Sequence, residues 1–303
     1  MAWLHDLQYK SSLNRGYNLL KQESYHPAAI AFRFALDRRP NDPRALEGMG
    51  IALGMQGGGL LEKGLTFLNQ AIDHTGPNER LLFYKILFLN HLDRKAEALF
   101  NATLYETPDC MNVKFLFMKA MVLKDNNRYL EALEALDRWE ALAGPNPQTV
   151  QLKSDLMVKT ERLELAIELL REGVAKWPNQ QVLRNDLGFY LVEHAQEAPE
   201  MEEAVMHLDQ AHRLAPKWAE PLSHRGFAYV KMGDLGKART DLEESQTLDP
   251  DSPYLYRNWA HLHLEEQAID LAREAMLKAL ELGFSERYGS EVEGMLRNLK
   301  KEN

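Results

Sequence analysis

Residues 181–218 read QVLRNDLGFYLVEHAQEAPEMEEAVMHLDQAHRLAPKW. Apolar and small residues recur in this stretch at helical spacing, in two runs that a polar segment separates. Pro216 follows the second run, and proline cannot continue a helix. The stretch therefore predicts two consecutive helices joined by a turn, and the rest of the chain shows the same pattern.

Prolines that stop helices recur along the chain at intervals of 31 to 38 residues. They are Pro40, Pro77, Pro108, Pro145, Pro178, Pro216 and Pro250. A period of this size is typical of one supersecondary unit that is repeated. A length of 303 residues would also allow two ordinary domains, but the repetition favours about eight helix pairs in one array.

Several of the expected first helices begin with a capping residue followed by proline at the first helical position. These pairs are Asp42-Pro43, Gly76-Pro77, Asn146-Pro147 and Ser252-Pro253. The start signals and the stop signals therefore agree on the same period.

The small and aromatic positions within each unit resemble those of the tetratricopeptide repeat. In the first four units they are Gly16, Leu19, Ala28, Phe32, Ala35 and Pro40; Gly50, Leu53, Gly64, Leu68 and Ala71; Leu87, Ala96, Phe100, Thr103 and Pro108; and Ala120, Leu123, Ala132, Leu136 and Trp139. In the last four they are Ala166, Leu170, Gly173 and Pro178; Leu187, Gly188, Leu191, Ala204, Leu208, Ala211 and Pro216; Gly226, Tyr229, Ala238, Leu242 and Pro250; and Trp259, Ala260, Ala272 and Ala279. The resemblance implies an all-α fold, a right-handed solenoid of helix-turn-helix repeats.

The repeat boundaries follow from these positions. We expect an N-terminal cap at 1–8, an array at 9–285 and a C-terminal capping helix at 286–303. The eight repeats are expected at 9–42, 43–76, 77–112, 113–146, 147–180, 181–218, 219–252 and 253–285. Trp3, Leu4 and Leu7 are spaced to cover the first pair, and the stripe of Val292, Met295, Leu296 and Leu299 is spaced to cover the last.

Glycine or alanine on a first helix leaves room for a large residue on the second helix. We therefore expect Gly188→Leu to overpack its helix pair. Two turns are longer than the others, at Gly57-Gly58-Gly59 and from Ala195 to Glu200. We interpret both as surface insertions, with a hinge or a contact loop as the alternative.

The resemblance also implies that first helices line a concave groove that holds a peptide segment of a partner protein. The candidate groove residues are Tyr17, Lys85, Phe88, Lys114, Phe117, Met121, Gln151, Asn185, Phe189, Phe227 and Arg257. The basic and amide residues with which one subclass grips a C-terminal carboxylate are missing, since Leu13 and Tyr17 occupy such positions in the first unit. An apolar strip for an extended or helical segment fits better.

Two other interpretations of the same residues remain. Aromatic residues and methionine at helical spacing also occupy protein cores. An exposed apolar strip can also join two copies of the chain as a homodimer. In either case we expect a protein partner or self-association, rather than a nucleic acid or membrane insertion.

Composition supports these expectations. The net charge of −9 disfavours a phosphate backbone as a partner. No leader peptide and no run of ~20 apolar residues is evident, and the chain has one cysteine, Cys110. We expect a cytoplasmic protein.

No pattern for catalysis, a cofactor or a metal is evident in the sequence. No phosphate-binding motif follows a strand pattern, and His261 and His263 point about 200° apart on their expected helix. Cys110 has no evident activating partner. We therefore expect a non-catalytic scaffold or adaptor without a cofactor, and an enzyme with an unmarked active site is the less favoured alternative.

Overall fold

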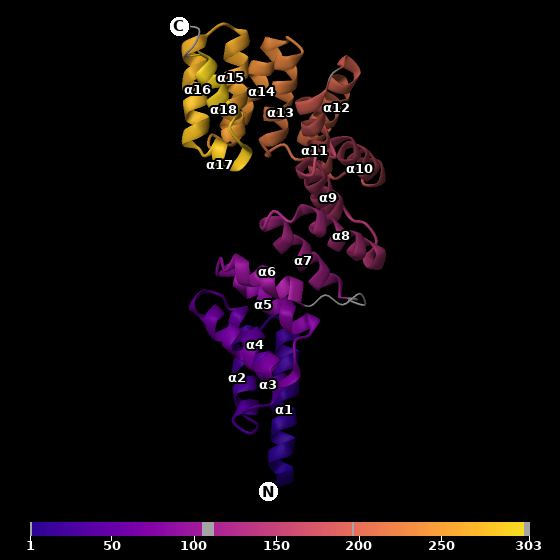
Figure 1. The fold of residues 1–303 in the computed structure, drawn as a ribbon, viewed down its shortest axis with the longest axis vertical. Helices are drawn as coiled ribbons and strands as arrows, with labels where there is room; N and C mark the ends of the chain where they lie inside the picture. Colours follow the sequence, from indigo (N-terminus) through magenta and orange to yellow (C-terminus); the bar gives the residue numbers. More distant parts are fainter. Residues whose placement is uncertain (1, 105–111, 196, 300–303) are drawn as a thin grey trace. The chain divides into compact units, whose positions relative to one another are not determined.

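The computed structural model describes residues 2–104, 112–195 and 197–299, and in these residues the regular structure is helical throughout (Figure 1). The chain divides into two compact units, Met1–Gly144 and Pro145–Asn303. The predicted all-α repeat fold is confirmed. Pro108 and Cys110 lie outside the described residues.

Unit 1 consists of helix pairs in sequence order. Its helices are α1 (Ala2–Lys21), α2 (Tyr25–Leu36), α3 (Pro43–Gly54), the 3-10 helix η1 (Gly58–Leu60), α4 (Leu61–Thr75), α5 (Glu79–His91), α6 (Lys95–Leu104), α7 (Val113–Asp125) and α8 (Tyr129–Ala143). The two helices of each pair pack against each other, and consecutive first helices α1, α3, α5 and α7 are also in contact.

Unit 2 repeats this arrangement and ends with two short helices. Its helices are α9 (Pro147–Lys159), α10 (Leu163–Lys176), α11 (Gln181–His194), α12 (Ala198–Leu214), α13 (Glu220–Lys231), α14 (Leu235–Leu248), α15 (Pro253–Glu265), α16 (Ile269–Glu281), α17 (Phe284–Tyr288) and α18 (Glu291–Leu299). The first helices α9, α11, α13 and α15 again contact one another in sequence order.

The core of each pair depends on close helix approach. A Cβ atom on Gly188 of α11 would lie 2.5 Å from Cγ of Leu208 on α12, and Leu208 is fully buried. In unit 1 a Cβ on Gly64 would lie 2.8 Å from the backbone oxygen of Gly50. Glycine is required at such positions because any side chain would occupy the space of the partner helix.

The turns inside the pairs also repeat. In six of the described pairs the turn contains one residue with positive φ, a conformation that closes a short connection between antiparallel helices. These residues are Glu23, Asp93, Asn127, Glu161, Gly233 and Gln267. The longer turn of the second pair instead contains Gly57 and Gly58, both with positive φ, and continues into η1.

Helix starts follow three of the four predicted cap positions, although Ser252 of α15 makes no side-chain cap hydrogen bond. Asp42 caps α3, and Asn146 caps α9 in a capping box with Thr149. The cap of α5 is Asn78 rather than Gly76, because the Asn78 side chain accepts hydrogen bonds from the backbone N–H groups of Arg80 and Leu81.

The two ends of the array differ from the sequence expectation in detail. Trp3 and Leu7 are 74% and 51% exposed, so the expectation that these two residues cover the first pair is wrong, and the side chain of Leu4 is outside the described part of the structure. At the other end α18 begins at Glu291, and the separate helix α17 precedes it. Val292 and Leu299 are buried, and α18 packs against α16 as a covering helix should.

Candidate functional site

The candidate site is the surface of the first helices, which we call the first-helix face. In unit 1 it belongs to α1, α3, α5 and α7, and in unit 2 to α9, α11, α13 and α15. Because consecutive first helices are in contact, side chains from neighbouring repeats meet on this face.

In unit 1 a polar cluster joins the first three repeats. The Tyr17 hydroxyl donates to the backbone oxygen of Arg44 at 2.8 Å, and the Arg80 guanidinium lies 5.5 Å from the Tyr17 ring centre. Arg80 also forms a close ion pair with Glu47, with 2.9 Å between Nε and Oε1. Burial raises the pKa of Glu47 despite this positive neighbour. Tyr17 therefore forms part of a bridge between repeats, and its side chain is partly exposed.

The other candidate residues of unit 1 lie at different depths. Phe88 is only 1% exposed, because its ring fills the space opposite Gly54, so Phe88 belongs to the core and not to a groove. Lys85, Phe117 and Met121 are partly buried, and Lys114 is exposed. Burial lowers the pKa of Lys85. The surface available on α5 and α7 is thus a mixture of lysine and apolar side chains.

In unit 2 a row of aromatic rings crosses three repeats. Phe189 of α11 lies 4.7 Å from His224 of α13 and 5.5 Å from Tyr254 of α15, measured between ring centres. Tyr254 in turn lies 4.4 Å from Tyr288 of α17 in an edge-to-face arrangement. Tyr288 is 48% exposed and Phe189 partly exposed, so the row presents apolar surface to the outside.

A carboxyl group without a positive partner lies beside this row. Asp186 accepts a hydrogen bond from Asn185 Nδ2 at 3.4 Å, and a second from the side chain of Gln151. Burial raises the pKa of Asp186 to about 7, and the negative charges of Glu220 and Asp155 raise it further. The described groups that act most strongly on Asp186 are amides and carboxylates, which leaves it an uncompensated acidic group on the face.

His224 completes a hydrogen-bonded chain with Asp186. The His224 Nδ1–H donates to Asn185 Oδ1 at 3.1 Å, and Asn185 donates to Asp186. Burial, with a smaller effect of the Arg257 charge, lowers the pKa of His224 to about 3, so the ring is neutral near pH 7. Asn185 is therefore a buried connector between these two groups and not a groove residue.

Arg257 is also enclosed. Its guanidinium binds both carboxylate oxygens of Glu193 at 3.0 Å, binds Glu291 of α18 at 2.9 Å, and lies 4.1 Å from the ring centre of Phe227. Burial alone would raise the pKa of Glu291, but a hydrogen bond from His261 and the Arg257 charge hold it at about 2. Arg257 is 4% exposed, so it joins α11, α15 and α18 and is not free to bind a partner.

The structure therefore divides the eleven sequence-predicted residues into two groups. Four are buried, and the others are partly or fully exposed. The buried residues are Phe88, Asn185, Phe227 and Arg257. The remaining residues are Tyr17, Lys85, Lys114, Phe117, Met121, Gln151 and Phe189.

The candidate groove residues do not include Asp186, Tyr254 or Tyr288, although all three belong to the aromatic row of unit 2 or lie beside it. Asp186 and Tyr254 have a signal in the sequence, since each stands one helical turn before a selected residue, Phe189 or Arg257. Tyr288 has no such signal, because helix α17 is not part of the repeat.

Two other kinds of site lack support in the described residues. None of the described helices combines the length and the hydrophobicity of a membrane-spanning segment. Within the same residues, no three histidine, cysteine, aspartate or glutamate side chains gather as a metal site requires.

Comparison with known proteins identifies the class of the fold. Residues 219–252 match the family model described as tetratricopeptide repeat. No curated protein matches the chain. The helical repeat array and this match together identify a tetratricopeptide-repeat solenoid.

Three solved structures show the same fold. The chain is similar to the APC/C hetero-tetramer Cut9-Hcn1 (TM-score 0.58, 17% identity), covering 93% of this chain and 54% of that one. It is similar to a tetratricopeptide repeat protein from Parabacteroides merdae (TM-score 0.57, 12% identity), covering 88% of this chain and 99% of that one. A thermophilic tetratricopeptide repeat protein of Thermus thermophilus gives a TM-score of 0.52 at 22% identity. The match covers 62% of this chain and 98% of that one. The chain thus spans about half of the first of these proteins, and the similarity concerns the fold.

Proposed function

We propose that the chain is a non-catalytic scaffold that binds a segment of a partner protein along the first-helix face of unit 2. Proteins with this fold generally mediate protein–protein interactions. The partner segment carries hydrophobic side chains for the aromatic row and a basic side chain for Asp186.

The observation that carries this proposal is the uncompensated carboxyl group of Asp186 next to Phe189. A lysine or arginine of a partner would ionise Asp186 and pair with it in a partly desolvated position, where an ion pair is stronger than at the open surface. Phe189 and Tyr288 would supply the apolar contact that anchors the segment.

The other charged groups of this face support a binding role over a catalytic one. Arg257, Glu193 and Glu291 neutralise one another in a structural cluster, and Lys231 Nζ donates to the backbone oxygen of Val192 at 2.6 Å. These groups hold helices together and are not directed at a shared open position, as acid–base chemistry requires.

The proposal can be tested without knowing the partner. Random peptides displayed on phage are selected on the immobilised protein, and the dissociation constants of the selected peptides are measured by calorimetry. We expect lysine or arginine next to aliphatic residues in the selected sequences, and binding weakened about tenfold by Asp186→Lys. A matched control is Glu172→Lys, which changes the same charge on an exposed position of the second helix α10.

Two outcomes would contradict the proposal. Selected peptides that lack basic residues, or that bind the Asp186→Lys protein as well as the wild type, would remove Asp186 from the site. A concentration-dependent dimer in light scattering that Phe189→Ala abolishes would favour self-association through the same face.

A further inference from the structure

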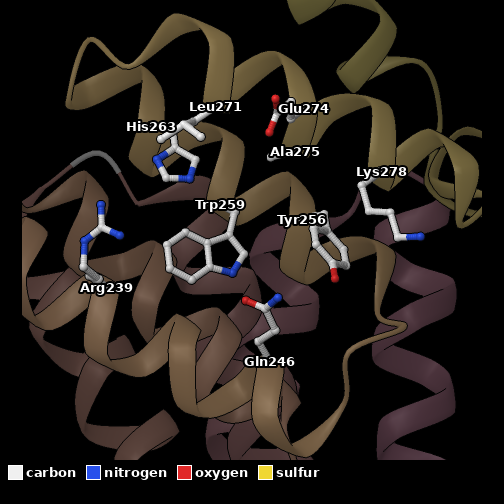
Figure 2. A pocket seen from close by; sticks show the side chains of 9 residues that line it. All are labelled: Arg239, Gln246, Tyr256, Trp259, His263, Leu271, Glu274, Ala275 and Lys278. Carbon is white, nitrogen blue, oxygen red and sulfur yellow. The ribbon is translucent and has the colours of Figure 1, made fainter.

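A second candidate site lies on the opposite side of helix α15. A pocket of about 370 Å³ opens between α14, α15 and α16 (Figure 2). Tyr256, Trp259 and His263 face this pocket, whereas Tyr254, Arg257 and His261 lie on the first-helix face. The two sets are separated by about half a turn of the helix, so the pocket is independent of the site proposed above.

The floor of the pocket is Trp259. The indole is only 8% exposed, His263 stacks on it at 5.4 Å between ring centres, and the Arg239 guanidinium lies 5.6 Å from its ring centre. The indole Nε1 is buried and has no hydrogen-bond acceptor among the described residues. Buried N–H groups are nearly always paired in folded proteins, so an unpaired donor on a residue that lines a pocket is a candidate to bind an acceptor there.

The preceding repeat has a carboxylate at the position equivalent to this pocket. Arg225 stands 34 residues before Trp259, and Asp241 stands 34 residues before Ala275. In that repeat the Arg225 guanidinium binds both oxygens of Asp241 at 2.7 and 2.8 Å, and binds Asp209 at 2.9 Å. In the last repeat the donor remains as an indole N–H, but Ala275 has replaced the carboxylate and left the space open.

Two basic side chains and one acidic side chain line the pocket. Lys278 and Arg239 line it, and Figure 2 shows Lys278 and the Tyr256 hydroxyl on the side of the indole nitrogen. Glu266 pairs with Arg239, with 2.6 Å between Nη2 and Oε1, and Glu274 is a negative group in the lining. Lys278 forms an exposed pair with Glu281 at 3.1 Å, which a new carboxylate can replace at little cost.

One surface side chain lies beside the indole of Trp259. The carboxamide of Gln246 lies next to the five-membered ring of Trp259 in Figure 2, and Gln246 is exposed. Exposed side chains change rotamer within picoseconds to nanoseconds, so Gln246 can turn away and open the path to Nε1.

We propose that this pocket binds an aspartate or glutamate side chain of a partner polypeptide. The carboxylate accepts a hydrogen bond from Trp259 Nε1 and lies near Lys278. It takes the place that Asp241 has beside Arg225 one repeat earlier. Leu271, which lines the pocket and is about half exposed, contacts an aliphatic neighbour of that residue. The partner therefore differs in charge from the basic segment proposed for the first-helix face.

The test follows the indole N–H resonances of the ¹⁵N-labelled full chain, with that of Trp259 assigned from Trp259→Phe. The probes are the blocked peptide acetyl-Leu-Glu-Leu-amide, its glutamine counterpart, and sodium acetate. We expect the glutamate peptide to shift the Trp259 resonance and the glutamine peptide to bind roughly tenfold more weakly, because charged hydrogen bonds are about twice as strong as neutral ones. Acetate should bind more weakly than the glutamate peptide, because it lacks the contact with Leu271.

Two matched variants separate filling of the pocket from a general effect of charge. Ala275→Asp supplies the carboxylate from within and should abolish peptide binding, whereas Leu277→Asp adds the same charge on an exposed position of α16 and should not. Circular dichroism verifies that both variants fold. If Ala275→Asp fails to fold, Lys278→Met provides the test, and we expect about threefold weaker binding.

Three results would overturn the proposal. In the first, the Trp259 resonance does not respond to the glutamate peptide. In the second, the glutamine peptide gives the same response as the glutamate peptide. In the third, acetate binds as tightly as the glutamate peptide, which would make the pocket a site for free carboxylates. Asp186→Lys should leave the Trp259 response unchanged, so this site and the first-helix face can fail separately.

Discussion

Replacing Asp186 by asparagine should stabilise the folded protein, by an amount that depends on pH. The pKa of Asp186 in the folded protein is about 7 because burial disfavours the charged form. The ordinary pKa of aspartate is about 3.9, and each unit of difference corresponds to 1.36 kcal/mol, so full ionisation costs at most about 4 kcal/mol. Asp186 is partly exposed and water screens its charge, so we expect about 2 kcal/mol.

The sign of the pH dependence follows from proton linkage. Between about pH 4 and pH 7 the folded protein binds a proton at Asp186 that the unfolded chain has already lost. The free energy of unfolding due to this group therefore falls as pH rises through that window. The free energy of unfolding of the Asp186→Asn protein should equal that of the wild type below pH 4. Above pH 7 it should be larger by the full amount estimated above. His224, whose pKa is lowered, acts with the opposite sign in both proteins, so it cancels in the difference.

The assay is equilibrium unfolding in urea at pH 4, 6 and 8 for the wild type and Asp186→Asn. Asp251→Asn is the control, since Asp251 is an exposed carboxylate in a loop and its replacement should have no effect. A gain in stability from Asp186→Asn that is equal at all three pH values would refute the explanation by burial of a charge. A loss of stability at pH 8 would show that the carboxylate is favourably paired in the folded protein.

Four further substitutions test the packing of the array by thermal or urea unfolding. Gly188→Leu should destabilise the protein by about 3 kcal/mol, because the added Cβ would lie 2.5 Å from a fully buried leucine side chain, and an unchanged midpoint would contradict this packing. Arg257→Met should cost about 3–5 kcal/mol, because it leaves two carboxylates without their shared cation; a cost below 1 kcal/mol would mean that solvent reaches them. Trp3→Ser should leave stability within about 0.5 kcal/mol, because the indole is exposed, and a larger loss would restore a capping role. Gly294→Ala in α18 should add about 0.5–1 kcal/mol, since the space around Gly294 is open, unless the last helix is frayed in solution.

The fold could be predicted from the sequence because the deciding interactions are local and repeated. Gly188 and Leu208 are 20 residues apart within one helix pair, and the same small and large residues recur in other pairs. Prolines and capping residues indicate helix ends, so the pairs follow from the period. Irregular parts, such as α17 and the Asn78 cap of α5, have no repeat to indicate them.

The candidate site could be predicted only in part. Helical spacing indicates which side of a first helix a residue faces, but not how deeply the next repeat covers it. Phe88 faces the predicted side and is buried because Gly54 leaves room for its ring. Arg257 is neutralised by Glu193, which is 64 residues away in the sequence, and no local pattern reveals such a pair.

The most direct test of the proposed binding face is photo-cross-linking of a selected peptide to single positions. A benzophenone amino acid replaces Gln151 on the first-helix face, Tyr288 at the end of the aromatic row, or Leu165 on the second helix α10, all of them exposed. The proposed binding mode predicts peptide adducts from at least one of the first two positions and none from Leu165. Adducts from Leu165 alone would place the peptide on the second helices and contradict it.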